Sequence, residues 1–175
     1  MKCRVCRGPA IIDIRRHNSN SCGEHFPKLC RDQTAKAIAQ FDMLEPGDSV
    51  LVAVSGGKDS LAVWDILREL GYDAEGFYVG LGIGEYCDVS AECAAGFAHA
   101  RDLTLHTEDL LRDHGFDVPH GSRAAERAPC SACGLTKRHL FDEAARRSGY
   151  DAIVTGHNLD DEAAVLMGNV LHWHT

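Results

Sequence analysis

The sequence predicts an α/β fold, a doubly wound parallel sheet, with a small cysteine-rich module before it. Three observations predict this organisation. Short apolar runs alternate with helix-type periodicity from Asp48 onward. A turn with two glycines follows the first apolar run, and two pairs of candidate metal ligands precede it. We therefore divide the 175 residues into a module at 1–32, a linker helix at 33–47 and an α/β domain at 48–175.

The N-terminal module places cysteine and histidine at the spacing of a zinc site. Cys3 and Cys6 form a C-x2-C pair, Cys22 and His25 form a C-x2-H pair, and fifteen residues separate the pairs. A segment this short cannot fold by apolar burial alone, so a metal would supply stability. Four ligands around one ion indicate a structural site. Cys30 is a substitute ligand, and chance thiols are the competing interpretation.

Helix and strand signals then follow in order along the chain. A helix is expected at Gln33–Met43, before the punctuation of Pro46 and Gly47. Strands are expected at 49–54, 74–79, 103–108 and 151–156, and helices at 58–70, 90–101, 134–148 and from 160 onward. A long loop is expected at 109–128. Buried-type strands that alternate with helices predict a parallel sheet covered on both faces.

The sheet is expected to be incomplete. Four strands are accounted for, whereas doubly wound sheets commonly have about five or more. The last helix runs into His172-Trp173-His174-Thr175 without a glycine or proline to end it. We therefore expect the α/β domain to be truncated at its C-terminus.

Composition limits the classes of function. The formal net charge of −8 argues against a general nucleic-acid coat, but residues 1–47 carry +3 and the remainder −11. Basic residues in the module could meet RNA phosphates: Lys2, Arg4, Arg7, Arg15 and Arg16. Eight cysteines without a visible secretory signal indicate a reducing, cytoplasmic compartment. No apolar run is long enough to span a membrane.

The turn at Ser55–Ser60, sequence SGGKDS, has the properties of an anion site. It connects a strand to a helix at the carboxyl edge of the sheet, where ligands bind in such folds. Glycines permit close approach of the backbone, and the helix N-terminus offers unpaired N–H groups. Lys58 adds positive charge, whereas Asp59 helps only if it holds a cation or caps the helix. The spacing is not that of a Walker A loop, and a simple turn is the alternative.

The SGGKDS turn resembles the pyrophosphate loop of the PP-loop ATP pyrophosphatases. That resemblance implies a fold like the adenine nucleotide alpha hydrolases. It also implies cleavage of ATP between its α- and β-phosphates, with adenylation of a carbonyl oxygen. The residues that would contact ATP are Ala53, Val54, Ser55, Gly56, Gly57, Lys58, Asp59, Ser60, Gly156 and His157.

Two later motifs carry further reactive groups. Cys130 and Cys133 lie at the end of the expected long loop, just before a helix, where a thiolate is favoured. They could be iron–sulfur ligands, a redox or persulfide pair, or half of a zinc site. Asp160 and Asp161 follow the fourth strand, and either caps the helix or provides a carboxylate for Mg²⁺ or proton transfer. His157 is either a surface residue or part of the same edge.

The five motifs occur in the order C-x2-C…C-x2-H, SGGKDS, LGIGEY, PCSACG and GHNLDDEA. This order resembles the tRNA 2-thiolation enzymes, and is most similar to the TtuA-type tRNA 2-thiouridine synthetases. The resemblance implies zinc on Cys3, Cys6, Cys22 and His25. It also implies a [4Fe–4S] cluster on Cys130 and Cys133, with a third ligand beyond this chain. The catalytic residues implied are Asp59, Lys137, Asp161, Cys130 and Cys133.

The expected function is an ATP-dependent tRNA sulfurtransferase, which adenylates the C2 oxygen of a tRNA uridine and replaces that oxygen with sulfur. Expected cofactors are ATP, Mg²⁺, Zn²⁺ and the [4Fe–4S] cluster. Expected partners are tRNA, a ubiquitin-like sulfur carrier or a sulfide donor, and a second copy in a homodimer. Two alternatives stay open: a related cytidine 2-thiolase, and an inactive, zinc-stabilised nucleotide-binding fragment.

Overall fold

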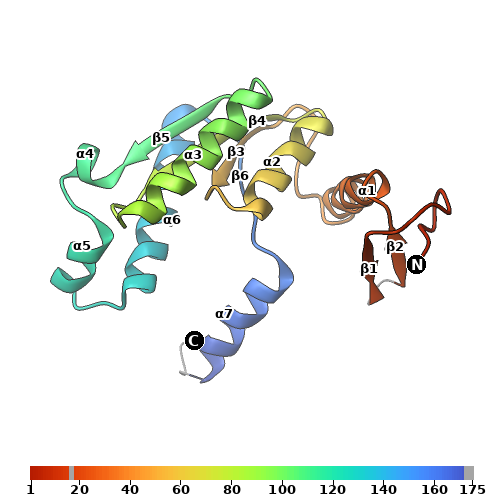
Figure 1. Ribbon diagram of the computed structural model, residues 1–175. Coiled ribbons are helices and arrows are strands. Elements are labelled where there is room, and N and C mark those ends of the chain that lie inside the picture. Colours follow the sequence, from red (N-terminus) through yellow and green to blue (C-terminus); the bar gives the residue numbers. More distant parts are fainter. Residues whose placement is uncertain (16–17, 172–175) are drawn as a thin grey trace. The chain divides into compact units, whose positions relative to one another are not determined.

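The computed structural model describes residues 1–15 and 18–171 (Figure 1). The described residues exclude Arg16 and His172–Thr175, named above, and the side chain of Tyr86 in LGIGEY is not described. The chain divides into two compact units, Met1–Pro46 and Gly47–Thr175. Each unit is described by itself below.

The first unit contains a two-stranded antiparallel ribbon and one helix. Strand β1 (Ile12–Ile14) pairs with β2 (Ser19–Ser21), and helix α1 spans His25–Gln40. The expected helix bounds are wrong at the N-terminal side, since α1 begins eight residues before Gln33. Pro27 lies in the first turn of α1. Proline is tolerated there because backbone N–H groups of the first turn make no hydrogen bond within the helix. Strands of three residues are too short to show a periodic pattern, so neither strand could be predicted.

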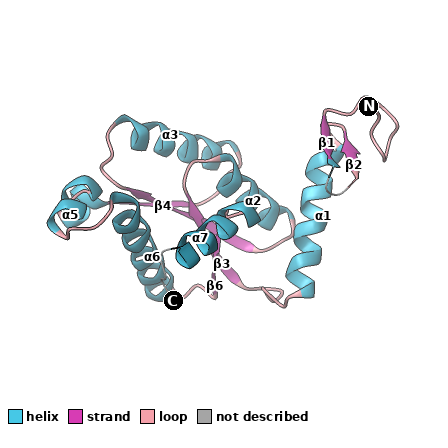
Figure 2. Ribbon diagram, turned by 90° about the horizontal axis from the view of Figure 1, so that it is seen from below, coloured by secondary structure: helices cyan, strands magenta, loops and turns pink. Residues whose placement is uncertain are grey.

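The second unit is a four-stranded parallel sheet in the order β5-β4-β3-β6. Its strands are β3 (Ser49–Val54), β4 (Asp73–Gly80), β5 (Leu105–Asp109) and β6 (Ala152–Thr155). Helices α2 (Lys58–Glu69) and α3 (Glu85–Ala100) cover one face, and α6 (Pro129–Ser148) covers the other (Figure 2). The predicted α/β fold with a doubly wound parallel sheet is confirmed.

Packing of α2 on the sheet fixes the turn that precedes it. Trp64 of α2 is fully buried, and its indole Nε1 donates to the Ala74 carbonyl at 3.0 Å. Gly76 leaves room for this ring, because a Cβ there would approach Trp64 to 2.5 Å. On the other face, Phe77 packs edge-on against Phe141 of α6, with ring centroids 5.8 Å apart. These contacts hold α2 and α6 on opposite sides of β3 and β4.

The segment expected as a long loop at 109–128 is mostly helical, so that expectation is wrong. It contains α4 (Leu110–His114) and α5 (Val118–Ala124). Asp109 and Asp117 cap them, by accepting hydrogen bonds from the backbones of Arg112 and His120. Both helices are too short for an apolar period to reveal them. Helix α6 also begins earlier than expected, at Pro129, so Cys130 and Cys133 lie within its first turns.

The last helix, α7 (Leu159–Leu171), has no buried residue. Its exposed apolar side chains include those of Val165, Leu166 and Met167. In the part of the chain that the structure describes, no helix combines the length and apolar character needed to cross a membrane.

Candidate functional site

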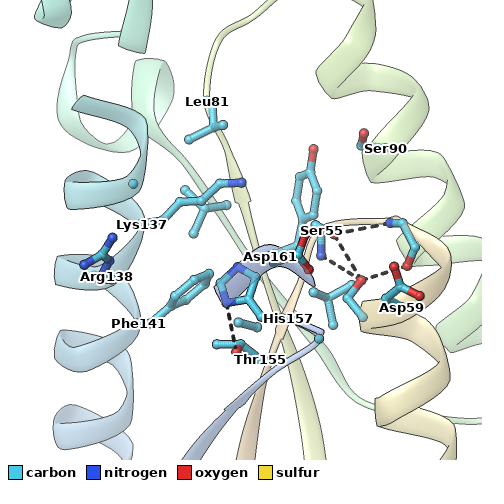
Figure 3. Close-up of a pocket in the computed structure, with 18 of the residues that line it drawn as sticks. Ser55, Asp59, Leu81, Ser90, Lys137, Arg138, Phe141, Thr155, His157 and Asp161 are labelled. Carbon is cyan, nitrogen blue, oxygen red and sulfur yellow. Dashed lines mark hydrogen bonds between the residues drawn. The ribbon is translucent and has the colours of Figure 1, made fainter. Parts of the chain in front are cut away.

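A cavity of about 440 Å³ lies at the carboxyl edge of the sheet, above the ends of β3, β4 and β6 (Figure 3). The SGGKDS turn lies at one side and α6 at the other, with the start of α7 between them. Its lining includes Ala53, Val54, Ser55, Gly57, Asp59, Ser60, Tyr78, Val79, Leu81, Cys87, Ser90, Gly134, Lys137, Arg138, Phe141, Thr155, Gly156, His157, Asp161 and Val165.

The turn is held closed by its own hydroxyl groups. Ser60 is buried, and its Oγ accepts from the Ser55 backbone N–H at 3.1 Å and donates to the Gly57 carbonyl at 2.9 Å. Gly57 precedes α2 in an extended conformation and makes no side-chain cap. The first N–H groups of α2 therefore have no side-chain acceptor at Gly57, which suits the binding of an anion.

Gly56 and Gly156 bring three segments of backbone together at the turn. Gly56 has φ +76°, and a Cβ would lie 2.3 Å from the carbonyl oxygen of Ser90 in α3. Gly156 follows β6, and a Cβ there would lie 2.6 Å from the backbone nitrogen of Ser60. The end of β6 therefore rests directly on the start of α2. The motifs SGGKDS and GHNLDDEA, about a hundred residues apart in sequence, form one wall of the cavity.

The carboxylate that enters the cavity from α7 is Asp161. Asn158 and Asp161 form a reciprocal cap, in which Asn158 Oδ1 accepts from the Asp161 backbone at 3.2 Å and Asp161 Oδ2 accepts from the Asn158 backbone at 2.9 Å. Asp160 contributes only its backbone N–H, which donates to Asn158 Oδ1 at 2.9 Å. His157 also faces the cavity, and its Nδ1 lies 3.2 Å from Thr155 Oγ1.

Positive charge enters from α6 and from the turn. Lys137 reaches toward the cavity centre, whereas Arg138 points away from it (Figure 3). Lys58 Nζ lies 2.7 Å from Asp59 Oδ2, and both side chains are well exposed, so this ion pair adds little stability. Asp59 lines the cavity but Lys58 does not.

The two cysteines of PCSACG lie beside the cavity rather than in its lining. Cys130 is exposed and Cys133 is half-buried. Gly134, the next residue, lines the cavity, and Lys137 lies four residues after Cys133 on the same face of α6. The thiol pair therefore has access both to solvent and to the rim near Lys137.

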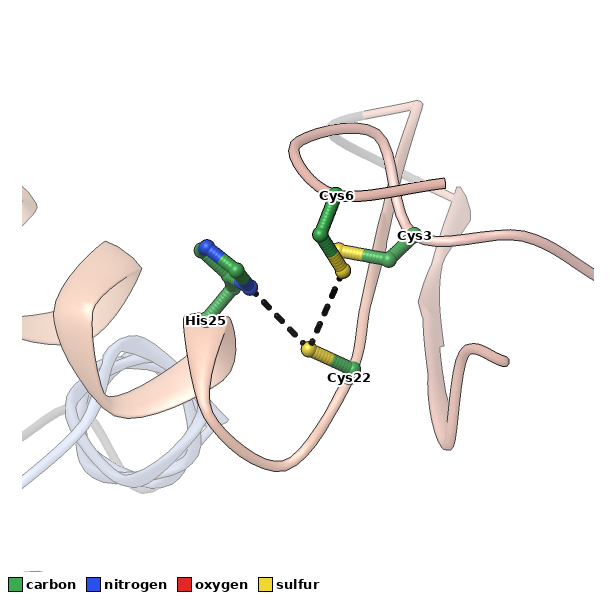
Figure 4. A group of neighbouring side chains, drawn as sticks. All are labelled: Cys3, Cys6, Cys22 and His25. Carbon is green, nitrogen blue, oxygen red and sulfur yellow. Dashed lines mark hydrogen bonds between the residues drawn. The ribbon is translucent and has the colours of Figure 1, made fainter. Parts of the chain in front are cut away.

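The first unit contains a separate group of four side chains that could bind a metal ion. The ligand atoms of Cys3, Cys6, Cys22 and His25 all lie within 4.8 Å of one another (Figure 4). Cys6 Sγ and Cys22 Sγ are 3.8 Å apart, and Cys22 Sγ is 3.1 Å from His25 Nδ1. A tetrahedral zinc ion with bonds of about 2.3 Å places sulfurs roughly 3.8 Å apart, so the donor set fits zinc. Cys30, the alternative ligand, is not part of this cluster.

Backbone hydrogen bonds favour the thiolate form at two of the three cysteines. Those from Cys6 and Cys22 lower the pKa of the Cys3 thiol, and one from His25 lowers the pKa of Cys22. At Cys6 a backbone hydrogen bond from Gly8 is outweighed by burial and by the thiols of Cys3 and Cys22, so the pKa of Cys6 is raised. A lowered pKa favours the thiolate, which is the form that ligates metal. By contrast, burial raises the pKa of Cys30.

The parallel sheet and the glycine turn at its carboxyl edge together define an α/β fold of the PP-loop type. A solved NH3-dependent NAD synthetase from Campylobacter jejuni has the same fold, with a TM-score of 0.56 at 13% identity over 75% of this chain and 57% of that chain. The U34-tRNA thiolase NcsA from Methanococcus maripaludis, solved with its [4Fe–4S] cluster, gives a TM-score of 0.83 at 27% identity. The structural match covers 100% of this chain and 60% of the NcsA chain.

Sequence comparison is more specific. Residues 2–27 match the family model for the N-terminal LIM domain of 2-thiouridine synthetase TtuA. The tRNA-5-methyluridine(54) 2-sulfurtransferase of Thermus thermophilus is 48% identical over 172 residues, which are 98% of this chain and 54% of that protein. The protein of the same name from Pyrococcus horikoshii is 39% identical over 175 residues, 100% of this chain and 56% of that protein. The chain belongs to the TtuA-type tRNA 2-thiolation family and spans about half the length of these curated relatives.

The cavity gathers most of the residues that the sequence singled out, and it adds others that the sequence did not. Tyr78 and Ser90 come from β4 and α3, and Phe141 and Val165 come from α6 and α7. None of these belongs to a local motif with a chemical signature. Sequence position was the only available signal. Tyr78 lies near the carboxyl end of a strand, and Phe141 and Val165 each lie one helical turn after a motif residue.

Proposed function

We propose that the whole protein is an ATP-dependent tRNA sulfurtransferase that converts a tRNA uridine to 2-thiouridine. The observation that carries this proposal is the cavity that joins the SGGKDS turn to Lys137 and Asp161, with Cys130 and Cys133 beside it. The turn offers an anion site, and Asp161 at the start of α7 offers a carboxylate. Helix α6 offers the cation of Lys137 and, beside the cavity, the thiols of Cys130 and Cys133. Three curated relatives, 38 to 48% identical to this chain, are named for 5-methyluridine 54, which favours that base as the substrate.

ATP would lie with its β- and γ-phosphates on the turn. The residues proposed to contact it are Ala53, Val54, Ser55, Gly56, Gly57, Lys58, Asp59, Ser60, Gly156 and His157. The N–H groups at the start of α2 and the Ser55 hydroxyl would face the phosphates. Asp59 is exposed at the cavity and would hold Mg²⁺ through a carboxylate oxygen, because carboxylates and phosphates are the ligands that this ion prefers.

The chemistry proceeds in two displacements. The uridine C2 oxygen attacks the α-phosphorus of ATP, and pyrophosphate leaves on the turn. Lys137 stabilises charge on the α-phosphate, and the second oxygen of Asp161 accepts the N3 proton of the base. Sulfur then attacks C2, and AMP leaves with the former C2 oxygen. Activation as an adenylate makes that oxygen a good leaving group.

Cys130 and Cys133 would be two of the ligands of a [4Fe–4S] cluster, and the chemistry that such a cluster would supply at this edge of the cavity is the binding of the sulfur atom. Their spacing and their place at the start of α6 fit two ligands of such a cluster. The cluster in this fold would need a third ligand beyond the residues described. A ubiquitin-like carrier or free sulfide would supply the sulfur.

The zinc site on Cys3, Cys6, Cys22 and His25 is proposed as structural, because all four positions are taken by protein ligands. We retain the division into a zinc module at 1–32, a helix at 33–47 and an ATP-binding domain from 48 onward as part of this proposal. A homodimer and a cytoplasmic location complete it.

Anaerobic incubation of the reconstituted protein with ATP, Mg²⁺, tRNA and sulfide tests this function. Digestion of the tRNA and mass spectrometry should identify a 2-thiouridine-type nucleoside. Lys137→Ala and Asp161→Asn should lose the product while ATP still binds. A thiocytidine product would identify a cytidine thiolase instead. Failure to release pyrophosphate from ATP and tRNA would favour an inactive nucleotide-binding fragment.

A further inference from the structure

A second hollow, here called the α5 groove, lies between the loop after β4, helix α5 and the start of α6. Its volume is about 380 Å³, within the range of about 300 to 1,000 Å³ typical of ligand sites. Its lining is Ile83, Val118, Pro119, Ser122, Arg123, Glu126, Arg127 and Pro129. The floor is apolar, and the charged side chains come from α5 and the residues that follow it.

The α5 groove is held in a fixed shape. Gly82 has φ +68°, and a Cβ there would lie 2.5 Å from the Cβ of Asp117, so the loop after β4 rests directly on the start of α5. The Val118 backbone N–H donates to the Leu81 carbonyl at 3.0 Å. Val118 and Ser122 are buried, and Ser122 Oγ donates to the Pro119 carbonyl at 3.1 Å. The floor therefore exists before any ligand binds.

Two residues that line the α5 groove are close in sequence to residues of the candidate active site. Ile83 lies two residues after Leu81, which lines the central cavity. Pro129 immediately precedes Cys130, the first cysteine of the reactive pair. Figure 1 shows α5 beside the beginning of α6. A linear polymer whose reacting monomer occupied the central cavity could therefore place the neighbouring monomer in this groove.

The charge of the rim favours a polyanion. Arg123 and Arg127 are both exposed, and both line the groove. The Asp117 carboxylate lies near Arg123: its pKa is lowered mainly by hydrogen bonds from His120 and in small part by the charge of Arg123. Glu126 is the single opposing charge among the lining residues. Apolar side chains between two arginines match the chemistry of a nucleotide, whose base has an apolar face and whose phosphate is anionic.

We propose that the α5 groove binds the nucleotide that flanks the target base in the RNA substrate. The base would lie on Ile83, Pro119 and Pro129, and the phosphates would contact Arg123 and Arg127. This inference rests on the proposed function, because it assigns a subsite for the same substrate.

The test measures tRNA affinity against salt. The full chain and its variants are titrated with fluorescently labelled tRNA by anisotropy at several KCl concentrations. Each phosphate contact with single-stranded nucleic acid contributes about 0.7 to the slope of log K against log salt. The double variant Arg123→Gln/Arg127→Gln should therefore have a slope smaller by about 1.4. Glu126→Gln should bind more tightly than the unmodified chain, a gain that a folding defect would not produce.

Arg146→Gln is the matched control, since it removes one exposed charge near the far end of α6. It should leave the salt slope unchanged, and calorimetry should give the same ATP affinity for all variants. An unchanged slope in the double variant would overturn the inference. The inference would also be overturned if the double variant bound tRNA normally but its thiolation activity no longer responded to a ubiquitin-like sulfur donor. The α5 groove would then bind a peptide. If the unmodified chain neither binds tRNA nor releases pyrophosphate, the proposed function itself fails.

Discussion

Replacing Gly156 by alanine tests whether the contact between β6 and the turn builds the nucleotide site. An alanine Cβ would lie 2.6 Å from the Ser60 nitrogen, 2.7 Å from the Ser60 Cα and 2.8 Å from the Asp59 carbonyl carbon. All three are backbone atoms at the start of α2, so no side chain can rotate to relieve the clash. Either β6 or the turn has to move.

The magnitude follows from the cost of inserting a methyl group where there is no room, about 1 to 3 kcal/mol. If the segments stay in place, this energy appears as a lower free energy of unfolding in urea. If the turn moves instead, the same energy weakens ATP binding by about fivefold to 150-fold. Calorimetric titration with ATP and Mg²⁺, beside urea unfolding of the same sample, measures both.

Gly96→Ala is the control, because a Cβ at this position of α3 would meet nothing within 4 Å. It should raise the stability slightly, by up to about 1 kcal/mol, since alanine favours helix. If Gly156→Ala matched the unmodified chain in both stability and ATP affinity, the close packing of β6 on the turn would be refuted as the basis of the site.

Four further outcomes are expected. Cys130→Ala should abolish thiolation and leave ATP affinity intact; persistent thiolation would exclude a cluster ligand at this position. Asp59→Ala should weaken binding of ATP with Mg²⁺ more than binding without it, and equal affinities by calorimetry would show that the carboxylate holds no ion. Removal of zinc by a chelator, or Cys22→Ser, should increase hydrogen exchange throughout Met1–Pro46 but not in β3 and β4; unchanged exchange would argue against a structural metal. Hydrogen bonds from Tyr150 and then His106 lower the pKa of Glu75, so ionised Glu75 stabilises the fold fully above its ordinary value of 4.5, and the effect is lost as pH falls through the lowered pKa. Tyr150→Phe should therefore cost about 1 kcal/mol at pH 7 and progressively less as the pH falls below 4.5 in urea unfolding, whereas a cost independent of pH would contradict this linkage.

The sheet could be predicted because its signals are local and strong. The buried run Ser49–Val54 is followed at once by SGGKDS, so one strand, one turn and one helix start were visible in a dozen residues. The helices α4 and α5 were missed because five and seven residues give no apolar period. Their capping residues, Asp109 and Asp117, were the available signal, and a following Gly115 in the left-handed conformation ends α4.

The site could be predicted where chemistry is concentrated in a motif, and not where it depends on tertiary packing. Ser55, Ser60 and Gly156 carry a recognisable pattern, and the cavity contains all three. Phe141 and Cys87 line the same cavity only because α6 and α3 pack on opposite faces of the sheet. An apolar residue on the inner face of a helix has the same sequence signature whether it supports the core or borders a ligand.

The capping role of Asp161 is compatible with the catalytic role proposed for the same carboxylate. Its Oδ2 accepts the Asn158 backbone N–H, which leaves Oδ1 available to the cavity. Helix α7 buries none of its described side chains, so packing does not orient this carboxylate. The reciprocal cap with Asn158 does so instead, because it fixes both the backbone of the first turn and one oxygen of the side chain. The three-position step from Asn158 to Asp161 would therefore serve the helix and the proposed active site through the same hydrogen bonds.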